Sequence, residues 1–430
     1  MSELYEIAYA AASERLCFLT GTGFSKAVTK DLALSWEYLL MSLCDQTSDP
    51  KKLKEILFPK NDRLPLEEVA QIISIELLNV GKNVYEETAK LVGTIKLAGD
   101  LSEISDFLTT RKLSVITTNY DKLFESLAGE KDCQSITPGL LVPRSEARIK
   151  VFHVHGSIDA PNNMVVTAKD YYNFINTESY FSRKLNTILH ENTVVILGYS
   201  LSDNDLKAII SSYKGFSGNQ EIGSSLFLIS RSKIQQHIKE YYAFCFGIRV
   251  LDGLEICDFF EKLNEEMPSA EKSRANSITA IRAVLKGATF TVEYIKLENS
   301  FYEIIASLGA EGLSINDPRV VLVIGGIIQT KIELTGENNA WDQYEGLARW
   351  LIYLASILEL HGTSIEKVFL DAVLKSMNSM CSRLITGYSW HAYNYWENSW
   401  STIITSNRIL IRNFIEKNTA WSDALVIVRR

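Results

Sequence analysis

The chain has 430 residues, of which 46% are hydrophobic and 22% charged, and this composition excludes a disordered or collagen-like protein. Its length predicts roughly two or three domains. The formal net charge of −8 repels the phosphate backbone of nucleic acids, so we expect no direct nucleic-acid binding. The six cysteines form no CxxC pair, which indicates neither a zinc ribbon nor a disulfide framework. The longest apolar run, 320–328, is shorter than the ~20 residues of a membrane helix, so we expect a cytoplasmic protein without a membrane segment.

Short runs rich in β-branched residues recur along the first 260 residues, and small or turn-forming residues follow each of them. The runs are 16–19, 113–116, 151–154, 194–197, 226–229 and 248–251. Their continuous hydrophobicity is typical of strands that are buried on both faces of a parallel sheet. Because helix-length segments separate the runs, the sequence predicts a doubly wound, mostly parallel, Rossmann-like α/β sheet that binds its ligands at the carboxyl ends of the strands.

Two segments depart from this alternation. Between about residues 35 and 110, apolar residues recur at helical spacing, for example at Leu66, Val69, Ile73 and Leu77, which predicts a helical insertion. The polar stretch 264–277 contains a proline and predicts a linker or a domain boundary. We therefore expect an α/β domain at 1–265 and a mainly α-helical domain at 266–430.

The C-terminal part is rich in aromatic residues. Six of the seven tryptophans follow residue 340. Such residues form either a buried core or an interface, and base rates favour the core.

The segment Gly21-Thr22-Gly23-Phe24-Ser25 lies between the first predicted strand and a predicted helix. Glycines there let backbone N–H groups approach a phosphate, and the helix N-terminus adds partial positive charge. The third glycine of a dinucleotide fingerprint and the lysine of a P-loop are missing. The segment is either a phosphate-binding loop or a tight turn.

Polar residues also follow the second predicted strand, at Thr118, Asn119 and Asp121. The amide can orient a water molecule and the carboxylate can hold sugar hydroxyls. Capping of the next helix is the alternative role for Asn119 or Asp121.

Two histidines mark the end of the third predicted strand. His155 stands at its tip beside a glycine, where it could take a proton from a ribose hydroxyl or a water molecule. His153 is interpreted as a structural residue. Since no matching Cys, His or Asp cluster accompanies the pair, we expect no metal site.

The fourth predicted strand is followed by the segment GYSLSDND, which begins at Gly198. Gly198 and the hydroxyl of Ser200 could meet a pyrophosphate, while later residues of the segment could cap a helix. Ser230 and Arg231 follow the fifth predicted strand and would also lie at the carboxyl edge of the sheet.

The succession GTGFS, TTNYD, VHGS and GYSLSD resembles the sirtuin-like (Sir2-fold) family as it occurs in prokaryotic antiviral defence proteins, over roughly residues 10 to 262. The resemblance implies that residues 21–25 line the pyrophosphate of NAD+ and that Thr118 belongs to the NAD+ site. It also implies that Asn119 and Asp121 stand by the nicotinamide ribose and that His155 is the catalytic histidine.

The remaining implied contacts concern the other half of NAD+. Gly198 and Ser200 would match the family's second phosphate-contacting loop, and Ser230 and Arg231 would lie beside the adenine ribose. Protein-deacylating sirtuins carry a four-cysteine zinc module and a glutamine before the asparagine. Here Thr118 precedes Asn119 and the zinc cysteines are absent, so no zinc is expected.

The resemblance implies an NAD+ glycohydrolase that depletes NAD+ in abortive infection, with residues 1–265 as its catalytic domain. It also implies a homo-oligomer and a possible partner, a hexameric translocase ATPase of the HerA type, docked on residues 266–430. Three alternatives remain: a module that senses NAD+ or ADP-ribose without turnover, a subunit of a nuclease complex, and an NAD-dependent protein deacylase.

Overall fold

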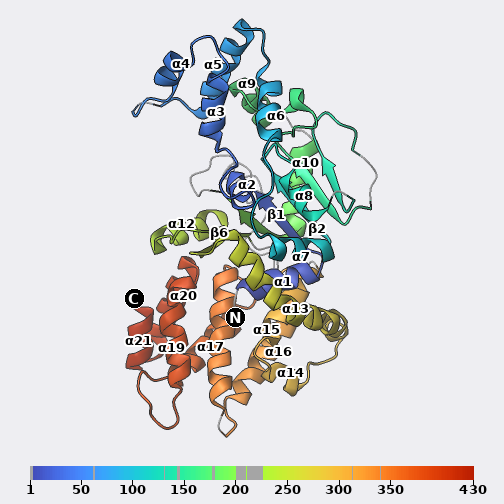
Figure 1. The fold of residues 1–430 in the computed structure, drawn as a ribbon. Helices are drawn as coiled ribbons and strands as arrows, with labels where there is room; N and C mark the ends of the chain where they lie inside the picture. The colour runs from blue at the N-terminus through green and yellow to red at the C-terminus, as the bar shows by residue number, and fades with distance from the viewer. Residues whose placement is uncertain are drawn as a thin grey trace.

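The computed structural model describes residues 3–61, 63–129, 131–142, 146–176, 180–199, 210, 226–311, 313–338 and 340–430. Figure 1 shows a central sheet, a group of helices from the first hundred residues on one side of it, and the C-terminal helices on the other side.

The described residues form a seven-stranded sheet in which every neighbouring pair is parallel. Its order is β3-β4-β2-β1-β5-β6-β7. The order reverses between β1 and β5, and ligands of such sheets bind at the carboxyl ends of the strands next to this point. The strands are β1 Leu16–Thr20, β2 Leu113–Thr117, β3 Cys133–Ile136, β4 Ile149–His153, β5 Thr193–Leu197, β6 Leu226–Ser230 and β7 Ile248–Asp252.

The predicted doubly wound, Rossmann-like sheet is confirmed, and each of the six predicted runs lies in a strand or overlaps one. The edge strand β3 was not predicted. It consists of Cys-Gln-Ser-Ile, and three of its four residues are only half-buried, so it lacks the continuous apolar run of the inner strands.

Helices cover both faces of the sheet. Alternate strand residues point to opposite faces, so that Phe18 joins one core cluster and Leu19 joins the other. The first cluster is covered by α1, α7, α8 and α13, and the second by α10 and α12. The helices of this domain are α1 Glu3–Ala12, α2 Thr22–Ala27, α7 Ser102–Thr110, α8 Leu123–Ala128, α9 Ala168–Asn176, α10 Tyr180–Glu191, α12 Gln236–Phe246 and α13 Ile256–Val284, with the 3-10 helix η1 Pro161–Asn163.

The region of the predicted insertion contains further helices with a separate core. Val69, Ile73 and Leu77 are buried there, as their helical spacing predicts. The last helix of the expected range, α7, packs instead under the sheet, where the ring of Phe107 contacts Phe18 at a centroid distance of 6.0 Å. The insertion helices are α3 Trp36–Cys44, α4 Pro50–Leu57, α5 Leu66–Asn79 and α6 Val84–Gly93.

The linker predicted at 264–277 is wrong, because this stretch lies inside the 29-residue helix α13. Leu263, Met267 and Ala270 recur at steps of four and three and are buried in the core under the sheet. This packing keeps the segment helical in spite of Pro268. The division into domains at 265 and 266 therefore falls within a continuous helix and stays a prediction.

The C-terminal region is helical around a core of its own. Trp350, Trp396 and Trp400 are buried in it, which confirms the core interpretation for these three, whereas Trp341 and Trp390 are exposed. Its helices are α14 Val292–Lys296, α15 Ser300–Ala310, α16 Pro318–Leu334, α17 Trp341–Ile357, α18 Glu366–Asn378, α19 Trp390–Ser399, α20 Thr405–Asn418 and α21 Ser422–Val428, with the 3-10 helix η2 Trp400–Thr402. Within the described residues, no helix combines the length and the hydropathy of a membrane span.

Candidate functional site

Three polar loops meet at the carboxyl edge of the sheet. They follow β2, β1 and β5, which are neighbours in the sheet, so the loops begin side by side. A fourth loop follows β4, on the far side of β2. Thr117 and His153, the last residues of β2 and β4, are paired in register. Asn119 and His155 each lie two residues beyond this pair.

The loops after β1 and β5 are in direct backbone contact. A Cβ atom on Gly198 would stand 2.0 Å from the nitrogen of Phe24, and one on Gly23 would stand 2.7 Å from the Cα of Gly198. Gly198 also has a φ of +74°, which disfavours other residues. These glycines are therefore required for the packing of the two loops.

The backbone N–H groups of the loop after β1 are largely used within the chain. Gly21 donates to the carbonyl of Leu197 at 3.0 Å, and Gly23 donates to the carbonyl of Gly198 at 2.9 Å. Phe24 donates to Gly21, and its side chain is buried with its ring 5.5 Å from that of Phe124. The loop thus has the tight-turn role that the sequence left open. Its role as a phosphate-binding loop stays a prediction that rests mainly on the half-buried Thr22, because the N–H group of Gly23 already donates to Gly198.

Asn119 is held by the loop after β1. Its side-chain amide donates hydrogen bonds to the carbonyl of Gly21 at 2.9 Å and to the hydroxyl of Ser25 at 2.8 Å. Because a backbone carbonyl only accepts hydrogen bonds, these contacts fix Nδ2 on the inside and leave Oδ1 as the acceptor. The side chain is half-buried at the sheet edge.

Asp121 completes this network. Its Oδ2 accepts from the hydroxyl of Ser25 at 2.7 Å, and its Oδ1 accepts from the N–H of Leu123 at 3.1 Å. Burial raises the pKa of Asp121, although the hydrogen bond from Ser25 opposes the shift. The bond to Leu123 is a local turn contact that precedes α8. The N-cap residue of this helix is Lys122, so the alternative of an N-cap at Asp121 is wrong.

Below Asn119 lies an ionic cluster whose centre, His153 and Glu125, is buried. His153 Nδ1 is 3.1 Å from the backbone carbonyl of Asn119, and its Nε2 is 2.8 Å from Glu125 Oε1. Lys122 Nζ stands 2.9 Å from the same carboxylate oxygen and 2.7 Å from Asp159. Burial alone would raise the pKa of Glu125, but the contacts with His153 and Lys122 lower it to about 2. His153 is thus a structural residue that supports the loop of Asn119.

His155 is almost completely buried, with 3% of its surface exposed. Helix α9 covers its ring, which lies edge-on to Tyr171 and Phe174 at centroid distances of 5.4 and 5.0 Å. The backbone N–H of Val165 donates to the carbonyl of His155 at 2.8 Å. The next residue, Gly156, has a φ of +84°, which lets the chain turn away from the strand.

The other predicted site residues lie along the same edge, at increasing distance from β2. The hydroxyl of Thr118 is 2.7 Å from the hydroxyl of Tyr199, which joins the loops after β2 and β5. Ser230 ends β6, where its hydroxyl donates to the carbonyl of Ser232. Arg231 is exposed and stands 3.9 Å from Glu255. Ser200 lies outside the described residues.

Several of these contacts could not be predicted from any single sequence motif. Tyr199 belongs to the segment GYSLSDND, but the sequence of this segment does not predict its contact with Thr118. Tyr171 and Phe174 belong to an ordinary amphipathic segment, and only the fold brings them to His155. In contrast, the spacing of Lys122 and Glu125 is that of a helical ion pair. In the part of the chain that the structure describes, no three His, Cys, Asp or Glu side chains are grouped so as to hold a metal ion.

The parallel sheet and its edge define a Rossmann-like α/β protein with a polar site at the carboxyl ends of β1, β2, β4 and β5. Residues 113–251 match the family model described as SIR2-like domain. This match runs from β2 to β7, includes Asn119 and His155, and confirms the expected sirtuin-like fold for this part of the chain.

One curated protein is also similar. A segment of the chain is 28% identical over 156 residues to the "NAD(+) hydrolase ThsA" of Cytobacillus dafuensis. The segment covers 34% of this chain and 31% of that protein, so the chain spans about a third of the length of the relative it matches.

Proposed function

We propose that the protein is an NAD+ glycohydrolase, which releases nicotinamide and ADP-ribose. The observation that carries the proposal is the position of Asn119, whose amide is fixed by Gly21 and Ser25 at the edge of a SIR2-like sheet. The likeness to a protein named an NAD(+) hydrolase supports the same reaction.

In the proposed reaction, the bond between nicotinamide and C1′ of the ribose breaks and its electron pair neutralises the nicotinamide ring. The oxygen of a water molecule forms the new bond to C1′, and the proton that it loses passes to His155. Because the transition state has oxocarbenium character, the main tasks of the protein are to orient the sugar and to exclude bulk water. Oδ1 of Asn119 accepts a hydrogen bond from the ribose or from the attacking water. A general base of this kind contributes about 10²- to 10⁴-fold.

The other site residues have roles in binding. Thr118 and Asp121 lie on the loop of Asn119 and hold the ribose. We propose that the segment 21–25, at its half-buried Thr22, and Gly198 with Ser200 bind the pyrophosphate, and that Ser230 with Arg231 bind the adenosine half. The strands that precede these loops follow one another in the sheet as β2, β1, β5 and β6. This order matches the order of ribose, pyrophosphate and adenosine in NAD+ and supports the assignment.

The proposed biological role is that of the NAD+-depleting effector in an antiviral, abortive-infection response in the cytoplasm. Such an activity must be restrained, so we propose a homo-oligomer that a partner regulates, for instance a hexameric ATPase of the HerA type. The helices between residues 292 and 428 have a core of their own and are suited to such docking.

A module that senses NAD+ or ADP-ribose without turnover is the second candidate. The burial of His155 beneath Tyr171 and Phe174 favours it, because a general base has to reach the reacting water.

The test is incubation of the purified protein with NAD+, alone and with the product of the neighbouring reading frame, followed by chromatography. Equimolar nicotinamide and ADP-ribose support the hydrolase. Release of nicotinamide only after addition of an acyl-lysine peptide indicates a deacylase. Tight binding of NAD+ without any product indicates the sensing module, and DNA cleavage without NAD+ turnover indicates a nuclease subunit.

A further inference from the structure

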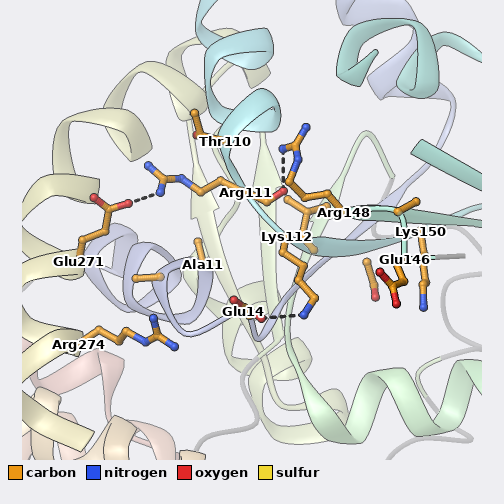
Figure 2. A pocket seen from close by; sticks show the side chains of 14 residues that line it. Ala11, Glu14, Thr110, Arg111, Lys112, Glu146, Arg148, Lys150, Glu271 and Arg274 are labelled. Atoms are coloured by element: carbon orange, nitrogen blue, oxygen red, sulfur yellow. Dashed lines mark hydrogen bonds and ion pairs between the residues drawn. The ribbon is translucent and has the colours of Figure 1, made fainter. Parts of the chain in front are cut away.

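A cavity of about 990 Å³ lies at the amino-terminal edge of the sheet, opposite the site described above. It opens where β2 and β4 begin and where α1 and α7 end. Helix α13 supplies a further wall, and Figure 2 shows Arg274 on this helix and Lys150 on the far side of the cavity.

The cavity is basic, although the chain as a whole is acidic. Five basic and three acidic side chains line it, a local excess of two positive charges in a chain of net charge −8. The basic residues are Arg111, Lys112, Arg148, Lys150 and Arg274, and the acidic ones are Glu14, Glu146 and Glu271. This charge favours an anionic ligand.

Two of the basic residues are paired with glutamates that are about half exposed. Lys112 Nζ is 2.9 Å from Glu14, and Arg111 is bonded to Glu271 (Figure 2). Exposed pairs of this kind contribute only about 0–1 kcal/mol to stability. A ligand anion can therefore replace Glu14 at little cost, because both side chains of its pair with Lys112 are exposed.

Other donors in the cavity wall have no hydrogen-bond acceptor among the described residues. Nη1 of Arg148 donates to the carbonyls of Leu108 and Arg111 at 2.5 and 3.0 Å, which fixes the guanidinium. Its Nη2 is buried without a hydrogen bond to any described residue, although Asp132 is 3.3 Å away. The Nε of Arg111 is buried and unsatisfied in the same way. Buried N–H groups without an acceptor are costly, and a phosphate oxygen would satisfy these two once the arginine side chains turn toward it.

Lys150 and Arg274 are exposed, and neither forms an ion pair or hydrogen bond with another residue that the structure describes. They stand on opposite walls of the cavity, so one phosphate group cannot easily serve both. Their separation favours a ligand with more than one phosphate group.

We propose that this cavity binds a small anion with two or more phosphate groups, of the nucleoside di- or triphosphate class. Its volume is at the upper end of the roughly 300–1,000 Å³ that is usual for small-molecule sites. The three carboxylates in the wall would repel the phosphates of an extended nucleic acid, which would have to pass over them. The site is separate from the proposed NAD+ site, since it lies at the other ends of β2 and β4.

The test is isothermal titration of the full-length protein with ADP, sodium diphosphate and adenosine at one ionic strength. The double variant Lys150→Glu/Arg274→Glu changes two exposed residues of the cavity. The matched control, Lys51→Glu/Lys52→Glu, makes the same charge change on the exposed surface of α4. Unchanged thermal unfolding of both variants shows that each is folded.

We expect ADP and diphosphate to bind the wild-type protein and adenosine not to bind. The cavity variant should weaken the binding of ADP and of diphosphate at least tenfold, whereas the control should bind both as the wild type does. Equal affinity for either probe in the cavity variant, or no binding at millimolar probe, would overturn the proposal. So would tighter binding of duplex DNA that the cavity variant abolishes. None of these outcomes depends on NAD+ turnover.

Discussion

The side-chain amide of Asn119 and the hydroxyl of Ser25 are joined by a hydrogen bond of 2.8 Å, and the same hydroxyl donates to Asp121 at 2.7 Å. Ser25 therefore sets the orientation of Asn119 without reaching the sheet edge itself, since it is buried. In terms of the proposed reaction, it is a positioning residue.

For Ser25→Ala we expect kcat for NAD+ hydrolysis to fall about tenfold, while KM changes less, because Asn119 loses one of its two acceptors. The measurement is steady-state kinetics under conditions in which the wild-type protein turns over. Ser126→Ala removes another helical hydroxyl, one that is exposed on α8, and should leave both constants unchanged. An unchanged kcat in Ser25→Ala would contradict the positioning role.

The close contact of two loops gives a prediction on stability. Gly198→Ala places a methyl group 2.0 Å from the nitrogen of Phe24 at a φ of +74°, so we expect a loss of more than about 3 kcal/mol of unfolding free energy. Gly247 also has a positive φ, +67°, but a Cβ atom added there would have no atom within 4 Å. Gly247→Ala should therefore cost only about 1 kcal/mol. Chemical denaturation of both variants measures this difference, and equal losses would refute the crowding argument.

The sheet could be predicted from the sequence because its inner strands are buried on both faces. Such strands are continuous apolar runs, and β1 and β5 are fully buried. The edge strand β3 and the helical state of 264–277 could not be predicted this way. In β3 the apolar run is absent, and in α13 the decisive contacts of Met267 and Ala270 come from the distant α/β core.

The sequence predicted which loops reach the carboxyl edge of the sheet, but not the contacts between these loops. The motifs identified which loops reach the carboxyl edge, because those loops follow strands directly. The use of the glycine N–H groups by Leu197 and Gly198, and the cover of α9 over His155, depend on contacts between residues far apart in the sequence.

The buried pair of Glu125 and His153 gives a pH-dependent prediction. Contacts with His153 and Lys122 lower the pKa of Glu125 from 4.5 to about 2, so the native state releases this proton more readily than the unfolded state does. The contribution to stability is present above pH 4.5 and is lost as the pH falls toward 2. Glu125→Gln should cost on the order of 3 kcal/mol at pH 7, and this difference should shrink below pH 4.5. Urea unfolding at several pH values measures it, with the exposed Glu265→Gln as the control; a difference that does not vary with pH would contradict the assignment.

Lys331 in the C-terminal region gives a second pH-dependent prediction, because burial disfavours its charged form in the native state. It is buried with Nζ 2.8 Å from Gln343 and 4.5 Å from the ring of Trp350, and burial lowers its pKa from 10.5 to about 8. Between pH 8 and 10.5 the unfolded chain holds a proton that the native chain has lost, so native stability rises with pH. Relative to Lys331→Met, the wild-type protein should gain on the order of 3 kcal/mol across this interval. Chemical denaturation at several pH values measures this gain. If the unfolding free energies of the two proteins changed equally with pH, Lys331 would not titrate in this way.

In the proposed reaction, Asn119 and His155 act together on the glycosidic bond of NAD+. The most direct measurement is nicotinamide release by the wild-type protein, Asn119→Ala and His155→Ala, with Asn398→Ala and His237→Ala as exposed controls of the same residue types. We predict that each site variant remains folded and loses at least 100-fold in turnover, while both controls keep full activity. Wild-type turnover in either folded site variant would show that the replaced residue has no part in the reaction.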